Sequence, residues 1–476
     1  MSIAAPPVPL SVKLGYGFGA MAYGIKDNGF STFLLLFYNQ VVGLPAATVG
    51  LVIAVALIFD ALIDPLLGIA SDRTRTRWGR RHPWLYASIL PIVASWVMLW
   101  HPPAWSETGL LIWLFFTAIL ARAAIATNEV PSLALAPELS RDYHERTRVI
   151  RYRYLFGWTG GLGFLILAYA WFLAPPRGAL AGPLALKGFG DYGTAGAFAM
   201  GLAVLISALA THRFVVARAA APVPRQSFAE LGEALRETLA NRAFLVLMAS
   251  GMLAYTAQGI SFALSNYLLG FVWQLKANEF VIYALVLLAG VGVAFALVTP
   301  VGQRLGKARA SAIFYATAAA LIVAPYVLRL LGLFPPPGSP AMLPAFLVFA
   351  GASTATGVAA FMTGASMMSD VVEASEETTG RREEGLFFAG ALFMQKCSSG
   401  AGILITGLLL SLAAFPDGAR PGAVPVAVLD WLTILFCAVY VALVWSSALL
   451  VLRFPFGKVE HDARLAKLAV AATEKG

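Results

Sequence analysis

Long apolar stretches recur along the chain, and each is separated from the next by a shorter polar or charged segment. Most of these stretches hold about 20 mainly apolar residues, the length that an α-helix needs to cross a lipid bilayer. The pattern predicts an all-α membrane protein with twelve transmembrane helices. The predicted spans are residues 15–41, 46–70, 84–101, 108–137, 149–174, 193–217, 244–272, 279–303, 309–333, 341–369, 386–414 and 426–452.

Basic residues are concentrated in alternate loops between the predicted spans. The loops after spans two, four, six and eight are rich in arginine and lysine, whereas the intervening loops hold few, among them Arg177 and Lys276. Cytoplasmic loops carry the excess of Lys and Arg in multi-pass proteins. We therefore expect the even-numbered loops and both termini to be cytoplasmic, in a bacterial inner membrane.

The longest polar interruption, residues 218–243, divides the chain into two sets of six spans. Ser227 begins a stretch in this segment with the pattern of a capped amphipathic helix. Residues 1–217 and 244–452 are thus expected to form two six-helix bundles, followed by a cytoplasmic tail at 453–476. Two such bundles with a cytoplasmic linker are typical of the major facilitator fold, which binds its substrate midway between the halves.

Composition excludes several classes of protein. The chain is 59% hydrophobic and only 12% charged, whereas a soluble domain is about 25% charged. The net charge of +9 belongs to the membrane-flanking loops, so we expect a lipid bilayer and no nucleic acid as partner. Two cysteines, Cys397 and Cys437, both lie in apolar stretches, and we expect no disulfide, metal cluster or other cofactor. No phosphate-binding glycine motif or nucleophile–base set is present, which argues against an ATP-driven pump and an enzyme.

Two carboxylates interrupt the second apolar span. Asp60 and Asp64 are one helical turn apart and therefore project from the same face of the helix. An unpaired carboxylate in hydrocarbon costs about 3 kcal/mol on insertion scales. A functional role is therefore the default interpretation of Asp60 and Asp64. Hard cations prefer oxygen ligands, and the pair is a candidate site for Na⁺ or H⁺. The alternative is a structural salt bridge to Lys or Arg on another helix.

The fourth span carries a second acidic position. Glu129 follows Thr127 and Asn128, which also offer oxygen, and Pro131 removes a backbone hydrogen bond nearby. We expect Glu129, with Thr127 and Asn128, to contribute to the cation site. The alternative is that Glu129 pairs with Arg122, two turns earlier on the same helix.

Three basic side chains lie well inside the predicted spans, away from their ends. Arg122 is expected to pair with an acid, the alternative being an anionic group on the substrate. Lys396 in span eleven could pair with the acids of the first bundle when no cation is bound. Lys26 and Asp27 are adjacent and about 100° apart on a helix, which predicts that they do not pair with each other. Asp27 could face the cavity, and Lys26 could reach another acid. Tyr23 is one of several aromatic residues that could stack on a sugar ring.

Several motifs together resemble one transporter family. They include a Lys-Leu-x-Tyr-Gly start at Lys13, Asp-Ala-Leu-Ile-Asp-Pro at 60–65, an arginine-rich loop at 72–80, and Gly-Arg-Arg-Glu-Glu-Gly at 380–385. The chain is similar over nearly its whole length to the glycoside–pentoside–hexuronide:cation symporters. The resemblance implies that Asp60 and Asp64 serve the cation and that Glu129 serves cation and sugar. It also implies that Lys396 couples the halves and that Arg153 contributes to sugar binding.

The chain departs from the family pattern at sugar-binding positions. Gly24 stands where the family has a sugar-binding aspartate, with Asp27 about one turn later as a possible substitute. Leu133 replaces a tryptophan that stacks on the sugar, and Ile63 replaces an asparagine between the two acids. The loss of that neutral ligand favours H⁺ over Na⁺.

We therefore expect a secondary transporter that acts as a monomer and couples a small solute, a glycoside or uronide, to Na⁺ or H⁺. The alternatives are transport of a lysolipid-like or other anionic amphiphile, and a receptor that does not transport. Retention of the buried acids argues against the receptor.

Overall fold

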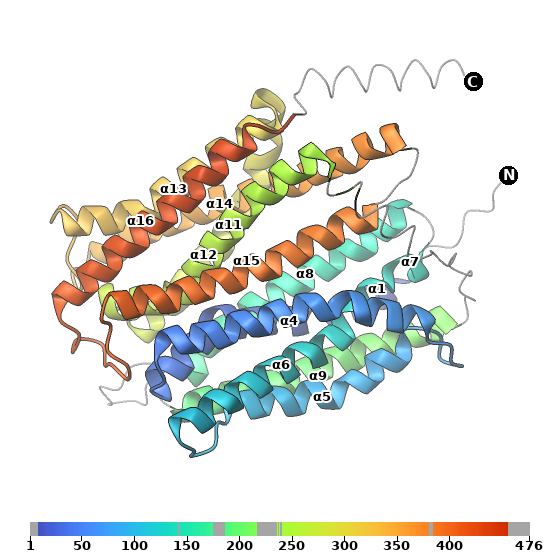
Figure 1. Ribbon diagram of the computed structural model, residues 1–476, viewed down its shortest axis with the longest axis horizontal. Helices are drawn as coiled ribbons and strands as arrows, with labels where there is room; N and C mark the ends of the chain where they lie inside the picture. The colour runs from blue at the N-terminus through green and yellow to red at the C-terminus, as the bar shows by residue number, and fades with distance from the viewer. Residues whose placement is uncertain are drawn as a thin grey trace. The chain divides into compact units, whose positions relative to one another are not determined.

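The computed structural model describes residues 8–140, 143–174, 186–216, 236, 238, 240–379 and 384–455 of the 476-residue chain. Every regular element in these ranges is helical (Figure 1). Eleven helices of the described part are long and apolar enough to cross a membrane. The broken first span completes the twelve that the hydropathy pattern predicts, so the fold class is confirmed.

The first span is built from several short helical pieces because the chain turns at Gly19 and Ala20 and then passes through two π-helical segments. π-helical turns inside α-helices occur frequently at functional sites. The pieces are α1 (Leu10–Phe18), α2 (Met21–Asn28), η1 (Gly29–Phe33), α3 (Leu34–Leu36) and η2 (Phe37–Val41).

The remaining helices agree with the predicted spans to within several residues at most ends, and α14 continues about ten residues further into a polar segment. Their bounds are α4 (Ala46–Arg73), α5 (His82–Trp100), α6 (Glu107–Leu133), α7 (Ala136–Leu139), α8 (Tyr143–Leu167), η3 (Ala168–Phe172), α9 (Leu186–Val216), α11 (Arg242–Tyr267), η4 (Leu268–Val272), α12 (Ala277–Leu305), α13 (Lys307–Leu330), α14 (Met342–Thr379), α15 (Glu384–Leu412) and α16 (Val426–Val451).

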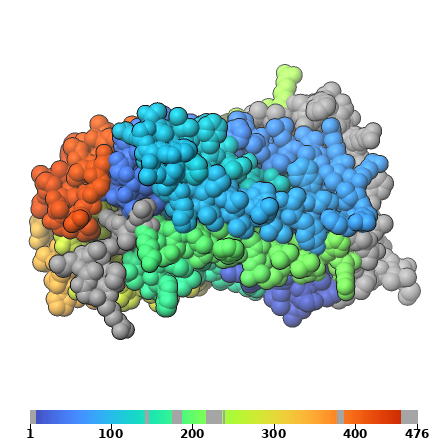
Figure 2. All heavy atoms as spheres, turned by 90° about the horizontal axis from the view of Figure 1, so that it is seen from below, coloured from blue at the N-terminus to red at the C-terminus, as the bar shows by residue number. Residues whose placement is uncertain are grey.

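The chain forms two compact units, and the first combines Met1–Val223 with Phe262–Ala284 and Ser399–Leu429. Within this unit α4 packs against α6, α5 packs against α6 and α9, and α2 packs against α8. Figure 2 shows side chains of α5, α6 and α9 side by side over one face. The core of this unit includes Trp96 and Trp100, both fully buried.

The second unit comprises Pro224–Ser261, Leu285–Ser398 and Asp430–Gly476. Here α13 packs along α14, and Lys307 Nζ lies 2.6 Å from Asp370 Oδ1 between the same two helices. Arg329 pairs with Asp430 at 2.8 Å. The predicted division into bundles 1–217 and 244–452 stays a prediction. The expected linker helix at 218–243 and the tail at 453–476 lie mostly outside the described residues. Residues 380–383 of the Gly-Arg-Arg-Glu-Glu-Gly motif also lie outside them.

Candidate functional site: an ionic cluster among α2, α4 and α6

Charged side chains from three helices of the first unit meet inside the protein. Lys26, on α2, is almost completely buried, and its Nζ lies 3.0 Å from Glu129 Oε2 on α6. The same Nζ lies 3.0 Å from Asp27 Oδ1. A buried ammonium group needs such partners, because desolvation of an isolated charge is costly. Lys26 is therefore the centre of a contact that joins α2 to α6.

A second ion pair joins α4 to α6. Arg122 Nη2 donates to Asp60 Oδ2 at 2.5 Å, and the side chains are 4% and 3% exposed. The guanidinium carbon also lies 5.0 Å from the centroid of the Phe30 ring. Asp60 and Arg122 thus form a salt bridge in the interior of the unit, as the structural alternative for Asp60 anticipated.

Two pairings differ from the simplest expectations. The prediction that Lys26 and Asp27 do not pair is wrong, because the four-carbon lysine stem reaches around the helix to the neighbouring carboxylate. The alternative expectation for Glu129 was an ion pair with Arg122. In the structure Glu129 pairs with Lys26, and Arg122 pairs with Asp60. The sequence showed which residues were charged, but the partner of each depends on how α2 and α4 pack against α6.

The predicted oxygen donors lie on two neighbouring helices without forming one compact group. Asp64 is half-buried on α4, and the Thr127 hydroxyl donates to the carbonyl of Ala123 at 2.8 Å. Within the described part of the chain, no group of three or more His, Cys, Asp or Glu side chains is placed to hold a metal ion. The carboxylates of Asp60 and Glu129 instead each face a basic side chain.

A polar network adjoins the ionic cluster and contains two of the predicted substrate residues. The Tyr23 hydroxyl donates to Asn128 Oδ1 at 2.6 Å, and Asn128 Nδ2 donates to Ser88 Oγ at 3.0 Å. Arg153, on α8, lies with its guanidinium carbon 4.7 Å from the Tyr23 ring centroid. Its Nη1 donates to Ser132 Oγ at 2.8 Å. Tyr23, Asn128 and Arg153, from α2, α6 and α8, are therefore brought together.

The packing of α2 against α8 explains why Gly24 carries no side chain. A Cβ atom at Gly24 would lie 2.2 Å from the carbonyl oxygen of Gly157 and 2.8 Å from Cα of Gly161. An aspartate at this position would therefore force the two helices apart. Asp27, whose side chain is 65% exposed, is the acid of this span that reaches outward.

The other predicted positions are dispersed. Leu133 is exposed at the end of α6, and Ile63 is half-buried on α4 beside Asp64. Lys396 is half-buried on α15, in the part of that helix that belongs to the second unit. Its pairing with the acids of the first unit stays a prediction.

The arginine-rich loop after α4 docks onto the short helix α7. Arg80 Nη2 and Arg81 Nε lie 2.9 and 3.4 Å from Glu138 Oε1, and Arg81 also pairs with Asp72. Arg73, Arg75 and Arg77 are exposed, as expected for residues that flank a membrane. This motif therefore both anchors the loop and presents positive charge.

A buried carboxylate ties the start of the chain to α8. Glu145 Oε1 accepts from the backbone N–H of Val8 at 2.9 Å and lies 2.6 Å from Lys13 Nζ. These interactions, led by the Lys13 hydrogen bond, hold the pKa of the Glu145 carboxyl below its usual value of 4.5. Glu145 is thus a structural acid.

Polar side chains also join segments at the far end of the first unit. Asn39 Nδ2 donates to Asp417 Oδ1 at 2.6 Å, and the Tyr267 hydroxyl donates to Asn39 Oδ1 at 2.9 Å. Gln40 bonds to the backbone of Pro416 and Ala419. We call Asn39, Gln40, Tyr267 and Asp417 the polar latch. It connects the end of the first span to the end of α11 and to the loop before α16.

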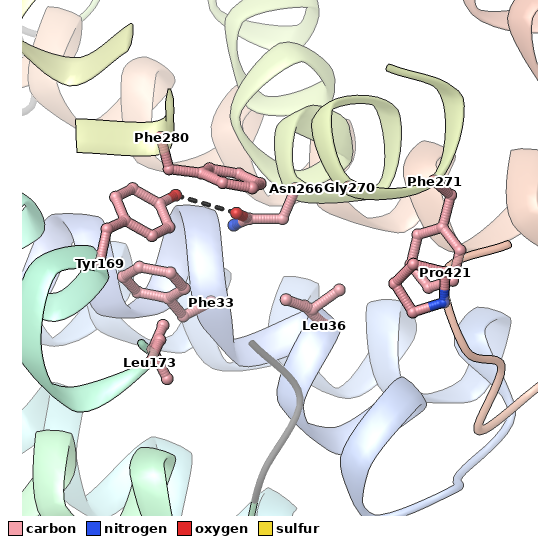
Figure 3. Close-up of a pocket in the computed structure, with 9 residues that line it drawn as sticks. All are labelled: Phe33, Leu36, Tyr169, Leu173, Asn266, Gly270, Phe271, Phe280 and Pro421. Atoms are coloured by element: carbon pink, nitrogen blue, oxygen red, sulfur yellow. Dashed lines mark hydrogen bonds between the residues drawn. The ribbon is translucent and has the colours of Figure 1, made fainter. Parts of the chain in front are cut away.

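A small cavity lies close to this latch. Phe33, Leu36, Phe280 and Pro421 contribute to its apolar lining, and the Tyr169 hydroxyl donates across it to Asn266 Oδ1 at 2.9 Å (Figure 3). No ionisable residue of the cluster lines it. The cavity is therefore a gap in the closed packing of these segments rather than the candidate substrate site.

Comparison with known proteins places this cluster in a family. A family model for MFS/sugar transport proteins matches residues 15–458. The chain belongs to the MFS/sugar transport family. Within this family it falls among the glycoside–pentoside–hexuronide:cation symporters, so the resemblance seen in the sequence motifs is confirmed, as is the assignment as a secondary transporter rather than an enzyme.

Two relatives and one solved structure illustrate the similarity. A putative glycoside/cation symporter, YagG of Escherichia coli (strain K12), is 27% identical over 436 residues, covering 90% of this chain and 88% of YagG. The isoprimeverose transporter of Lactiplantibacillus pentosus is 32% identical over 154 residues, 32% of each chain. A crystal structure of a D-xylose-proton symporter superposes with a TM-score of 0.63 at 14% identity, covering 93% of this chain and 97% of that one. This last likeness shows the major facilitator fold.

Several residues of this transporter's site carried no recognisable signal in the sequence. Ser88 and Ser132 are small polar residues in apolar spans, and Phe30 is one of 31 phenylalanines. Their contacts with Asn128, Arg153 and Arg122 depend on helix packing. The glycines at 157 and 161 form a small-residue pattern on α8, which permits close helix approach and could have been found from the sequence.

Proposed function

We propose that this symporter couples the uptake of a glycoside or hexuronide to the entry of Na⁺ or H⁺ by alternating access. The observation that carries the proposal is the buried cluster of acids and bases among α2, α4 and α6. Buried charges in a membrane are costly and mark ion or substrate pathways. We also propose that both termini lie in the cytoplasm of a bacterial cell.

Glu129 is the acid at which a mobile cation can compete with a basic side chain of the protein. Its side chain is 28% exposed, in contrast to the nearly inaccessible Asp60. A cation at Glu129 would release Lys26 Nζ, which keeps Asp27 as its second partner. The exchange would leave Lys26 neutralised in both states. Asp64, half-buried on the neighbouring helix, is the second acid that we assign to the mobile cation.

Tyr23 and Arg153, which are buried and in contact with each other, are the residues that we assign to the sugar. An aromatic ring can stack on the apolar face of a pyranose, and a guanidinium group can donate two hydrogen bonds to vicinal hydroxyls or to a carboxylate. The Tyr23 hydroxyl donates to Asn128, the residue next to Glu129. The two residues assigned to the sugar therefore contact α6 at Asn128 and Ser132, close to Glu129. A relative transports isoprimeverose, by its name, which supports a glycoside.

One observation favours a second substrate class, the anionic amphiphiles. Leu133 is an exposed apolar residue at the place of a sugar-stacking tryptophan in the family, a feature that suits an amphiphile with an alkyl chain. The other argument for an anionic amphiphile was Arg122, which here is engaged by Asp60. We therefore favour the glycoside.

Ion-driven uptake into proteoliposomes tests the proposal. Purified protein would be given radiolabelled isoprimeverose, a glucuronide or lysophosphatidylcholine under an inward Na⁺ gradient, an inward H⁺ gradient or neither. We expect a sugar to accumulate above its external concentration under one of the two gradients. Accumulation of the lysophospholipid alone would select the second substrate class, and equilibration of every sugar under both gradients would refute coupled sugar transport.

A further inference from the structure

Arg122 and Asp60 form the most enclosed ionic contact of the cluster. The carboxylate and the guanidinium are both about 97% shielded from solvent and are 2.5 Å apart. Phe30 covers the guanidinium on another side, with 5.0 Å between the guanidinium carbon and the ring centroid. The three side chains come from α4, α6 and η1, so the contact is fixed by three separate backbone elements.

This contact cannot be released by titration of the arginine. Guanidinium stays protonated at all physiological pH values. A cation that displaced it from Asp60 would leave a positive charge beside an aromatic ring inside the protein. The neighbouring acids Glu129 and Asp27 already pair with Lys26. Removing one partner of a buried ion pair is strongly destabilising.

The consequence concerns the choice of coupling cation. A metal cation such as Na⁺ requires several oxygen ligands at once, and carboxylates contribute both charge and oxygen. Arg122 neutralises the negative charge that Asp60 would otherwise offer to such an ion, and its hydrogen bond occupies Oδ2. Ile63, on the same helix, presents a hydrocarbon side chain beside Asp64.

We propose that Arg122 is a resident counter-cation that removes Asp60 from the cation site and so determines ion specificity by excluding Na⁺ from that carboxylate. The proposal rests on the proposed function, cation-coupled symport, and refines it. Asp60 becomes a structural acid, and the mobile cation is left to Asp64 and Glu129. Arg122 acts on specificity through Asp60 and touches neither the cation nor the sugar.

Na⁺-dependent thermal stability tests this assignment without any transported substrate. The melting temperature of purified protein would be measured in NaCl and in choline chloride of equal ionic strength. Three proteins would be compared: the native chain, Arg122→Gln, and the double variant Arg122→Gln/Asp60→Asn. The double variant replaces the ion pair by two neutral amides of similar size, and so serves as the matched control for the unpaired carboxylate.

We expect Na⁺ to stabilise Arg122→Gln by about 2 °C or more beyond its effect on the double variant, because a ligand that binds the folded state raises the melting temperature. The native chain should respond as the double variant does. Two results would overturn the proposal: a larger Na⁺ response in the native chain than in the double variant, or equal responses in all three proteins.

Arg122→Gln could also fold in only one of the two salts or in neither. Folding only in NaCl would support the proposal as Na⁺-dependent stabilisation of this variant, whereas failure to fold in both salts would count against the proposal.

The two failures are distinguishable. If native protein accumulates no sugar under either gradient, the proposed symport is refuted, whatever the thermal shifts show. If it accumulates sugar and the Na⁺ response of Arg122→Gln does not exceed that of the double variant, the assignment of Arg122 alone is refuted.

Discussion

Lys26 Nζ lies 3.0 Å from Glu129 Oε2, and this contact links the broken first span to α6 inside the first unit. Each partner offsets the desolvation of the other, because a lone charge in either position would be buried without compensation. The lysine also contacts Asp27, so it can lose one acid and keep another. This arrangement suits a residue that exchanges partners when a cation binds.

The Lys26–Glu129 contact predicts a non-additive loss of stability. Lys26→Met should lower the free energy of unfolding by about 2–3 kcal/mol, because the Glu129 carboxylate loses this charged partner. Glu129→Gln should cost less, because Lys26 keeps its contact with Asp27. The double variant should lose less than the sum of the two single losses. Thermal melting of the four proteins in detergent, arranged as a double-mutant cycle, measures the coupling. Additive losses would show that the two side chains do not interact in solution.

A substitution at Gly24 tests the close packing of α2 against α8 without changing any charge. Gly24→Ala should cost about 1–3 kcal/mol because its methyl group would overlap the Gly157 carbonyl oxygen. Gly163→Ala on α8 is the matched control, since nothing lies within 4 Å of a Cβ atom there. Melting temperatures of the two variants give the comparison. Equal behaviour of both would contradict the close approach of α2 and α8.

Glu145 predicts acid sensitivity outside the membrane spans. Its pKa is lower in the folded protein than the ordinary 4.5. Its contribution to stability is therefore complete above that ordinary value and is lost as the pH falls through the lower folded value. Native protein should lose stability more steeply below about pH 4.5 than Glu145→Gln, which starts lower at pH 7. Melting curves from pH 7 to pH 3 check this; parallel curves for both proteins would contradict it.

The polar latch predicts a change in accessibility. Asp417→Ala removes the acceptor of the Asn39 amide, whereas Asp417→Asn keeps an acceptor oxygen at that position. Leu36→Cys, buried beside the cavity, serves as a reporter after Cys397 and Cys437 are replaced. Maleimide should label this thiol several-fold faster in Asp417→Ala, with a smaller change in Asp417→Asn. Unchanged labelling in Asp417→Ala would mean that the latch does not hold these segments closed.

The twelve spans could be predicted from the sequence because each membrane helix requires a continuous run of apolar residues. The sequence did not predict the breaks in the first span, since the turn at Gly19 and Ala20 lies within such a run. The charged residues of the cluster were all identified, because ionisable residues are rare in apolar spans. Their partners were not all identified: Lys26 reaches both Glu129 and Asp27, and Arg122 reaches Asp60. Which side chains pair between two helices depends on how the helices are rotated and tilted, and the hydropathy pattern does not determine this.

The central claim is that acids beside the α2–α6 contact couple a cation to sugar movement. Asp64→Asn separates the two processes, and Asp191→Asn, an exposed acid near the start of α9, is the matched control. The measurement is sugar movement into proteoliposomes in two modes: counterflow without an ion gradient, and uphill accumulation with one. We predict that Asp64→Asn retains counterflow while its ion-driven accumulation falls to the equilibrium level, and that Asp191→Asn behaves as the native protein. Normal uphill accumulation by Asp64→Asn would contradict the account.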